Sequence, residues 1–570
     1  MKRILIFMTV TGLFFSCQRE EGDPSFASDT TISVQPNTKA EVNTDNNTLL
    51  GWVALTGKTD IPAEEAQATA LATAMQMRKV EGIVTKAPLQ IGSVEVVKGD
   101  TRKPYVATKG SKPEPADVYI INFANNQGYV VTSGDRRVPG VLAYNSYGHL
   151  GDTISNPGQA VLFSYMQAYI EEQREAFEAN KEKLATQAEE ALFKKLSKER
   201  QAELIARGYF DKQGKRVKSK FLDLTHVLCQ SKELDKDNGN NHSDDFDEDR
   251  GRHTGTNLPK KNGPVLDPEA TTYGEWTTEY IKAPLLKTLW GQSGEYNDKV
   301  GVYCEADHDQ SPVGCVATAI GQLIAYHKKP AIFKDRVMHW DDMTKIDRGD
   351  MFSSIYSYAV QNNPTAKEDI QYLLAHLGDS DLLDMDYGCA DIGSGSNIYK
   401  ALHTLKLLGF NNAFISSLEA FPNFTNEIQN NRPVYIRGCE TEISHSYSKG
   451  WWFWKKNHID RTYTNCHAWV LDGYVLKKRK VTEQYIDCPS PKRIEMTHEE
   501  KLELVHNNFG WGGYRDGSGK KIYPQEYDGT GWYMANIFDS KSGRKAPSNS
   551  FKSGEQGNFK YDLKIITNIE

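Results

Sequence analysis

The sequence predicts an α+β protein in which a small α+β unit precedes a larger unit that begins near Tyr273. Apolar residues recur at helical spacing in the first part of the larger unit, and short runs rich in Val, Ile, Tyr and Trp fill its last part. A polar segment with few apolar residues separates the two units. At roughly 150 residues per domain, the 570 residues allow two to four domains.

The composition is that of a globular protein without a strong charge bias. The chain is 39% hydrophobic and 25% charged, and its net charge is −7. Because lysines and arginines are scattered along the chain, nucleic acid is not an expected partner. The 8 cysteines include no C-x-x-C pair, so the spacing indicates neither a metal site nor a disulfide framework, and we expect no cofactor.

The N-terminus has the pattern of an export signal. Two basic residues precede an apolar run, 4–15, which has the length of a signal-peptide core and is too short to span a bilayer. The run ends in "LFFSC", which resembles a bacterial lipobox in which Cys17 carries the lipid. We therefore expect a lipoprotein signal peptide over 1–17 and an exported protein held at the outer membrane or cell surface by lipid alone, or released after activation. Plain secretion with an ordinary cleavage site is the alternative.

Residues 43–232 are expected to form one α+β unit with a helical arm. An alanine-rich pattern over 64–80 predicts a helix, and three short β-rich runs follow between 117 and 145. From 159 to 207 the chain has Glu and Lys partners at i,i+4 spacing around an intermittent apolar stripe, which predicts a long helical segment.

The segment 233–264 is predicted to be an exposed linker. It is dense in charge, Gly, Asn and Pro, and cannot bury enough apolar surface to stay ordered. Arg250 and Arg252 lie in this stretch, where proteolytic cutting concentrates. The linker is thus a candidate processing site, and a solvated spacer without processing is the alternative.

The larger unit, 265–570, begins with helical patterns and ends with strand patterns. Helices are expected from Cys315, over 369–377 and over 398–408, and strands are expected in five later runs, the last of which is "YDLKIIT". The predicted core comprises Val316, Ala319, Leu323, Val434, Ile436, Trp469, Leu471, Val505 and Trp532.

Cys315 stands at the first turn of a predicted helix, directly after a loop that contains Pro312 and Gly314. The free N–H groups and the positive end of the helix dipole favour a thiolate there, and the thiolate is the nucleophilic form of cysteine. The apolar stripe of the helix is supplied by other residues, so Cys315 is not needed for packing. A free cysteine that packs as a small hydrophobe is the alternative.

Two later strands offer the partners that a nucleophilic cysteine needs. His467 is expected at the head of one strand and Asn508 on another. An asparagine carbonyl can accept a hydrogen bond from one imidazole nitrogen and leave the other facing the sulfur, which is the Cys-His-Asn scheme of the papain-like proteases. Taken singly, each residue has an alternative explanation: His467 as a polar residue at a strand end and Asn508 as a turn former.

Four sequence blocks make a family resemblance specific. "GCVATAIGQLIAYHKKP", "HAWVLDGY", "HNNFGWGG" and "APLLKTLWGQSGEYND" resemble the blocks of the streptopain family of secreted bacterial cysteine peptidases. The resemblance implies a papain-like fold, with a helical subdomain and an antiparallel β subdomain, preceded by a small α+β inhibitory propeptide. It places Gln292 as the oxyanion donor, and "NNQGYVVTSGDRRVPGVLAYNSYGHL" is similar to the propeptide.

The chain departs from the family pattern at three places. Phe509 replaces the usual Trp after the asparagine, and Cys466 replaces a small residue before the histidine. An insertion over 477–501 is expected as a loop over part of the cleft. The candidate substrate-binding residues are Cys466, Trp511 and Ser394. Ser394 lies in a Gly-Ser stretch that is similar to one in the family.

These features predict an exported cysteine endopeptidase, made as a zymogen, that acts on peptides or proteins and is inhibited by its own propeptide. Cys315, His467, Asn508 and Gln292 are its expected catalytic residues. A catalytically silent surface binding protein and an acyltransferase or amidase with the same triad are the alternatives. A disulfide between Cys315 and Cys466 is a further hypothesis, against the alternative that Cys466 is a packing residue.

Overall fold

The structure of the chain is a computed structural model. It describes residues 47–83, 88–99, 101–106, 115–151, 156–217, 272–305, 307–345, 363–389, 393–417, 422–449, 456–487, 492–511, 514–515, 521–522, 529–536 and 561–570. The predicted signal peptide with Cys17 and the predicted linker 233–264 lie outside the described residues. In the part of the chain that is described, no helix is long and apolar enough to cross a membrane.

The N-terminal unit is a small antiparallel sheet with helices packed against it. Its elements are α1 (Asn47–Thr56), α2 (Ala63–Val80), β1 (Ile91–Lys98), β2 (Thr101–Pro104), β3 (Val118–Phe123), η2 (Ala124–Asn126), β4 (Tyr129–Ser133), β5 (Val141–Asn145), α3 (Pro157–Lys195) and α4 (Lys198–Ala206). The buried face of α2 carries Ala66, Ala70 and Ala74, whose small side chains allow the helix to lie close to the sheet. The helices and strands predicted over 64–207 are therefore confirmed.

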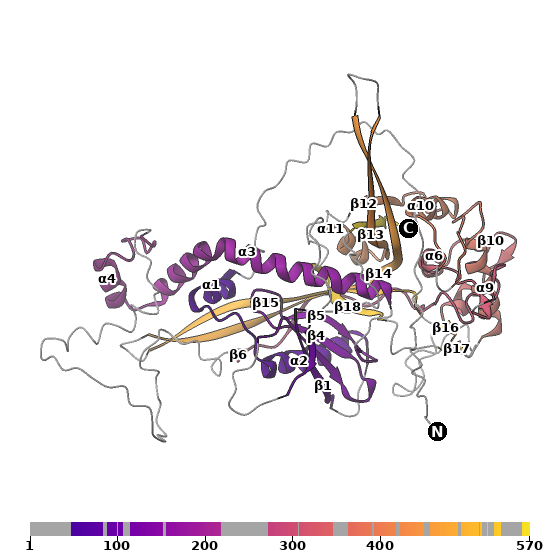
Figure 1. The fold of residues 1–570 in the computed structure, drawn as a ribbon. Helices are drawn as coiled ribbons and strands as arrows, with labels where there is room; N and C mark the ends of the chain where they lie inside the picture. Colours follow the sequence, from indigo (N-terminus) through magenta and orange to yellow (C-terminus); the bar gives the residue numbers. More distant parts are fainter. Residues whose placement is uncertain are drawn as a thin grey trace, which may run out of the picture.

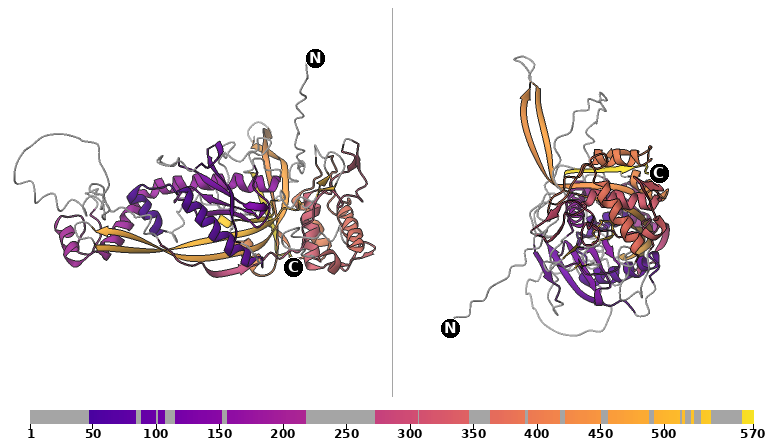
Figure 2. Two further views of the ribbon diagram at one scale, coloured as in Figure 1. Left: turned by 90° about the horizontal axis from the view of Figure 1, so that it is seen from below. Right: turned by 90° about the vertical axis from the view of Figure 1, so that its right-hand side faces the viewer.

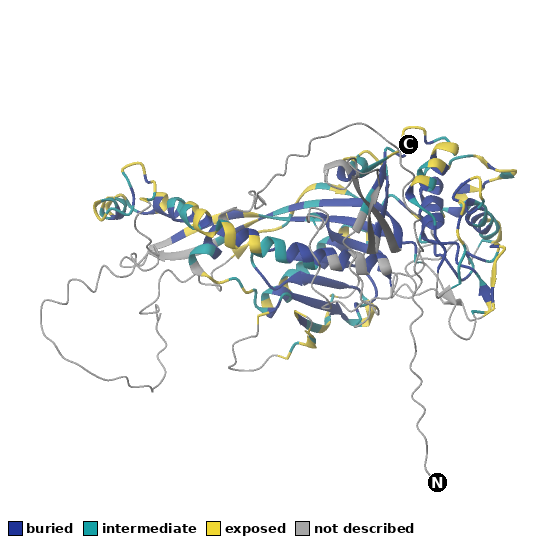
Figure 3. Ribbon diagram, turned by 45° about the horizontal axis from the view of Figure 1, so that its top comes forward, coloured by how far each residue is buried: buried dark blue, intermediate teal, exposed yellow. Residues whose placement is uncertain are grey.

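The C-terminal unit has a helical part and a strand-rich part. Its elements are β6 (Thr272–Tyr273), β7 (Thr277–Lys282), β8 (Tyr303–Cys304), β9 (Asp309–Gln310), α6 (Cys315–His327), β10 (Ile332–Phe333), β11 (Arg336–Val337), α7 (Trp340–Met343), α9 (Pro364–Leu377), α10 (Ile398–Leu407), β12 (Phe414–Ser417), α11 (Pro422–Gln429), β13 (Val434–Lys449), β14 (Lys456–Asp487), β15 (Lys492–Asn508), β16 (Tyr514–Arg515), β17 (Lys521–Ile522), β18 (Gly531–Met534) and β19 (Tyr561–Thr567). All of the predicted core residues are buried. Buried positions fill α6 and the centre of the sheet (Figure 3).

One antiparallel sheet runs through both units. The strand order is β12-β19-β13-β14-β15-β18-β5-β4-β3-β1-β2. The two units meet between β18 and β5, where Trp532 is opposite Tyr144 and Tyr533 is opposite Ala143. The N-terminal unit thus adds its strands to the edge of the larger unit's sheet (Figure 1).

β14 is long enough to form two separate hairpins. Its first half pairs with β13, and its second half pairs with β15 from Val470 opposite Asn508 to Asp487 opposite Lys492. His467 therefore lies within β14 and not at the head of a strand, because the pairing with β13 extends the strand back to Lys456.

The insertion 477–501 is not a loop over the cleft. Its described residues, 477–487 and 492–501, continue β14 and β15 as a two-stranded ribbon that runs alongside α3 toward α4 (Figures 1 and 2). The prediction of a cleft loop was wrong because apolar and polar residues alternate in this stretch, and that period of two favours a strand with one covered face.

Candidate active site

Cys315 is the first residue of α6, as the sequence predicts. The preceding Gly314 has a φ of 85°, and a Cβ on it would stand 2.4 Å from Met385 Cε and 2.7 Å from the Ser394 carbonyl oxygen. Only glycine both adopts this positive φ readily and leaves room for these neighbours, so the chain can turn sharply into the helix at this point. Cys315 is 1% exposed and is disulfide-bonded in this structure, so its sulfur is not a thiolate here.

The imidazole of His467 is buried, with 1% of the residue exposed, among aromatic rings. Trp469 stacks on it at 6.0 Å between ring centroids, and Trp511 meets it edge-on at 5.6 Å. Nε2 donates to the Phe509 carbonyl at 3.0 Å, and within the described part of the chain Nδ1 has no hydrogen-bond partner.

Burial determines the charge of this imidazole. Desolvation lowers the pKa of His467 to about 4, although the hydrogen bond to the Phe509 carbonyl acts in the opposite direction. At neutral pH the ring is therefore uncharged, with its proton on Nε2 and a lone pair on Nδ1 that can accept a proton.

The Asn508 side chain does not hold the imidazole in this structure. Its Oδ1 accepts from Gln322 Nε2 and from the Gly510 N–H, each at 3.2 Å, and its Nδ2 donates to the Thr288 carbonyl at 2.8 Å. The backbone carbonyl of Phe509 takes the predicted place. The predicted hydrogen bond between the Asn508 side chain and the His467 imidazole is thus absent, because the side chain at the end of β15 turns toward α6.

Gln322 is a site residue that sequence reasoning missed. Its Oε1 accepts from Thr288 Oγ1 at 2.9 Å and from the Trp290 N–H at 3.2 Å, while its Nε2 donates to Asn508. The signal was present in the sequence, because Gln322 is a polar residue in an apolar stretch and lies seven residues, or two turns, after Cys315. Through Gln322, one helix holds both the segment before the cysteine and the strand end beside the histidine.

Gln292 lies beside the loop that leads to Cys315. Its backbone carbonyl accepts from the Val313 N–H at 2.8 Å, two residues before the cysteine. The residue is 7% exposed, and within the described residues its Nε2 has no hydrogen-bond partner. A buried amide donor without a partner is costly, so it is a candidate for a group that binds a ligand atom.

The first turn of α3 covers His467. A Cβ on Gly158 would stand 2.7 Å from the imidazole Cδ2 and 2.3 Å from Cδ1 of the Phe509 ring. Asn156 caps this turn, because its Oδ1 accepts from the N–H groups of Gly158 and Gln159 at 2.8 and 3.2 Å. Gln159 Nε2 then donates to the hydroxyl of Tyr533, on β18, at 3.0 Å. The N-terminal unit is thereby fixed against the candidate histidine.

Comparison with known proteins identifies both units. Residues 290–518 match the Peptidase C10 family, and residues 64–170 match the Spi protease inhibitor family. The chain therefore contains a streptopain-family peptidase domain preceded by a protease inhibitor domain. The resemblance found in the sequence blocks is confirmed.

A curated relative of the peptidase is the thiol protease/hemagglutinin PrtT of Porphyromonas gingivalis. The two are 24% identical over 277 residues, which cover 46% of this chain and 25% of the relative. The chain therefore spans about a quarter of the length of that relative.

Of the three candidate substrate-binding residues, Trp511 has the most suitable position for contact with a substrate beside His467. It is partly exposed and contacts the imidazole. The Ser394 hydroxyl instead closes its own loop, since it accepts from the Gly388 N–H and donates to the Gly388 carbonyl, both at 3.3 Å. Cys466 is buried and disulfide-bonded, and its sulfur accepts from Arg437 Nη2 at 2.8 Å.

A disulfide joins Cys304 to Cys389 across 85 residues of the peptidase unit. It ties β8 to the loop that leads to Ser394 and therefore to the wall beside Gly314. Cysteine spacing gave no indication of this pair. Cys304, Cys389 and Asp307 also form a metal-ligand cluster among the described residues, but sulfurs bonded to each other are not thiolate ligands.

Proposed function

We propose that the chain is the zymogen of an exported cysteine endopeptidase with a papain-like arrangement of its two subdomains. One observation carries the proposal: the inhibitor unit places the first turn of α3 against His467, the neutral imidazole that follows the disulfide-bonded Cys466 in β14. An inhibitor unit that covers this residue is expected if His467 belongs to the active centre.

The reaction begins when an external thiol has reduced the disulfide of Cys315 by thiol–disulfide exchange and the start of α3 has moved away. The thiol gives its proton to His467 Nδ1, and the thiolate attacks the carbonyl carbon of the substrate. The C–N bond then breaks as the imidazolium protonates the leaving amine, which leaves a thioester on Cys315. Water hydrolyses the thioester with His467 again as the base, so the acid product leaves and the thiol is restored.

Gln292 and the helix start are proposed to stabilise the oxyanion. The unpaired Gln292 Nε2 and the backbone N–H of Cys315 are the donors for the negative oxygen that develops on the carbonyl. The Phe509 carbonyl fixes the Nε2–H tautomer of His467, so that Nδ1 is the nitrogen available to the sulfur. Asn508 is assigned a positioning role through Gln322.

Latency follows from the place of the inhibitor unit. Substrate cannot reach the imidazole while Gly158 lies on it, and the pairing of β5 with β18 holds the unit in place. We propose that a cut in the linker 233–264 releases a fragment that starts between Arg250 and Tyr273. Export, and anchoring through a lipid on Cys17, belong to the same proposal.

The test is covalent labelling of the activated chain by an epoxysuccinyl thiol-protease inhibitor, together with assays on short peptides with and without amine acceptors. We expect labelling at Cys315 and hydrolysis. A silent binding protein would leave Cys315 unlabelled, and an acyltransferase would transfer the acyl group to the amine faster than to water. Either of these results would contradict the proposal.

A further inference from the structure

We propose that the β14–β15 ribbon is a second docking surface for the inhibitor unit, remote from the active centre, and that it governs how tightly the cut zymogen holds together. The ribbon is defined as 477–487 with 492–501, and the arm as α1 together with 184–217. This inference rests on the proposed function and adds a named contact that regulates the same site.

The first observation is a hydrophobic cluster shared by the arm and the ribbon. Ile494 and Met496 of β15 are 6% and 5% exposed. They pack in a cluster separate from the main cores of the two units. The arm supplies the other buried members of this cluster, which are Trp52, Leu192, Phe193, Leu196, Leu204 and Phe210.

One face of the ribbon is apolar and buried at this contact. Ile494, Met496 and His498 are buried, whereas Glu495 and Thr497 between them are exposed. A two-stranded ribbon is at best marginally stable by itself, so its apolar face needs a cover. In this chain the cover is the arm.

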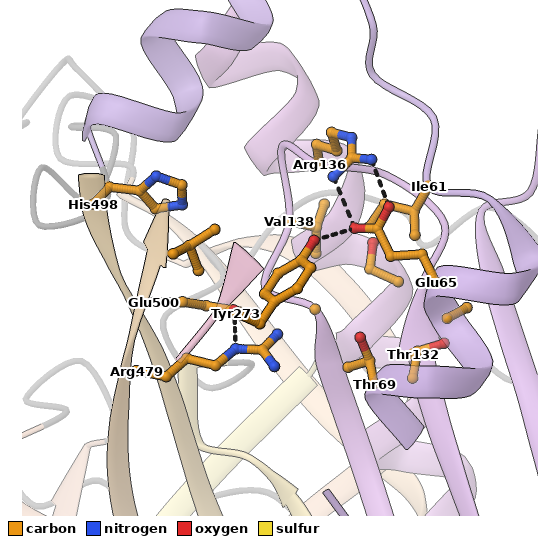
Figure 4. A pocket seen from close by; sticks show the side chains of 14 residues that line it. Ile61, Glu65, Thr69, Thr132, Arg136, Val138, Tyr273, Arg479, His498 and Glu500 are labelled. Carbon is orange, nitrogen blue, oxygen red and sulfur yellow. Dashed lines mark hydrogen bonds and ion pairs between the residues drawn. The ribbon is translucent and has the colours of Figure 1, made fainter. Parts of the chain in front are cut away.

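A second set of contacts joins the units near the base of the ribbon (Figure 4). Glu65 of α2 forms a bidentate pair with Arg136 and accepts from the Tyr273 hydroxyl at 2.7 Å. Arg479 of β14 lies over the Tyr273 ring, 4.4 Å from its centroid, and pairs with Glu500 of β15. Contacts thus run without a break from the inhibitor helix α2 through Tyr273 to the ribbon.

α3 links the two docking surfaces. Its 39 residues form a single helix, about 58 Å long at 1.5 Å per residue, that begins on His467 and carries Leu192 and Phe193 of the cluster near its other end. A contact at one end therefore raises the effective concentration of the other end at its own site. Binding of the arm to the ribbon makes it easier for Gly158 to return to the imidazole after the linker is cut.

The experiment uses the full chain with a specific protease site placed in the linker. After the linker is cut, the complex is diluted, and the appearance of peptidase activity on a short peptide gives the concentration at which the inhibitor unit leaves. Ile494→Asp with Met496→Asp should raise that concentration by about 100-fold or more, equivalent to about 2.7 kcal/mol, because two buried apolar contacts are replaced by charges. Thr497→Asp, on the exposed face of the same strand, is the matched control and should stay within about twofold of the wild type.

Each outcome separates this inference from the proposed function. If the double variant and the control dissociate at the wild-type concentration, the second docking surface does not exist, although the peptidase assignment stands. If the activated wild type has no thiol-dependent activity, the proposed function fails instead. Should the double variant misfold, shown by lost activity after full activation, Leu204→Ala in α4 decides, because it leaves the peptidase unit unaltered. Weaker retention supports the surface, and unchanged retention overturns it.

Discussion

Gly158 of the inhibitor unit and His467 of the peptidase unit are so close that a Cβ on the glycine would stand 2.7 Å from the imidazole Cδ2. Few real side-chain contacts are this short, and the same Cβ would stand 2.3 Å from the Phe509 ring. The fit between inhibitor and histidine thus depends on the absence of a side chain.

Gly158→Ala should raise the peptidase activity of the uncut zymogen. The added methyl forces the first turn of α3 off the imidazole, while alanine itself favours the helix, so the unit still folds. We expect the uncut full-length chain to show at least about 10-fold more activity on a short peptide, equivalent to about 1.4 kcal/mol. Gln159→Ala, which removes hydrogen bonds but adds no atoms, is a comparison variant. If Gly158→Ala is as latent as the wild type, α3 does not block the histidine.

Acid should loosen the inhibitor. The pKa of His467 is lowered from 6.5 to about 4 in the closed state, so this state favours the neutral ring. Because the first turn of α3 adds to this burial, the stability that it contributes is fully present above pH 6.5 and is lost as the pH falls toward 4. Release of the inhibitor unit from the cut chain, followed by size-exclusion chromatography, should therefore speed up between pH 6.5 and 4.

His467→Gln provides the control for this pH dependence. Burial raises the pKa of Glu81, which contacts Trp532 across the same interface, so acid acts on that carboxyl in the opposite direction. The difference between wild type and His467→Gln isolates the histidine. Identical pH profiles for the two proteins would show that the imidazole does not titrate with release.

Gln322→Glu should lower turnover more than substrate affinity. The carboxylate keeps the acceptor for Thr288 and Trp290 but loses the donor to Asn508, so the strand end beside His467 loses its tie to α6. We expect kcat of the activated enzyme to fall by about 10-fold with KM within about twofold, because the reacting groups are misplaced while the substrate surface is kept. A drop in thermal stability with unchanged kcat would make Gln322 a purely structural residue.

Gln292→Ala should cost on the order of 10²-fold in kcat, as expected for the loss of one oxyanion donor. Because Nε2 has no protein partner within the described residues, its removal should not reduce the stability of the fold.

Cys315→Ala is the inactive control for these assays, and activity that survives in this variant would refute the site. Asn508→Ala should retain measurable activity because the Phe509 carbonyl still orients the imidazole.

Air-oxidised protein should need a reductant, and Cys466→Ala should not. Cys315 and Cys466 are both disulfide-bonded in the structure, and Cys466 precedes the candidate base in β14. We expect non-reducing peptide mapping to join Cys315 to Cys466. Sulfenic acid on Cys315 would also require a reductant, but that requirement would persist in the variant. Equal recovery of both proteins on reduction would eliminate this latch.

Local patterns in the sequence indicated most of the helices and the place of the candidate nucleophile. The apolar repeat after Gly314 indicated α6 with Cys315 at its first turn, and the alanine-rich pattern over 64–80 indicated α2. Such inferences succeed because hydrophobic period, glycine and helix-start chemistry are properties of neighbouring residues. The family blocks indicated the inhibitor unit and the peptidase unit for the same reason, because each block is contiguous in the chain.

The partners of the side chains were decided only by the tertiary structure. Asn508 turns to Gln322 and leaves the imidazole to the Phe509 carbonyl, because α6 lies within hydrogen-bond reach of the end of β15. The insertion 477–501 became a ribbon, since the helical arm is there to cover Ile494 and its neighbours. A period of two predicts a face, but which element covers that face depends on contacts between residues hundreds of positions apart, and a single sequence carries no local signal for them.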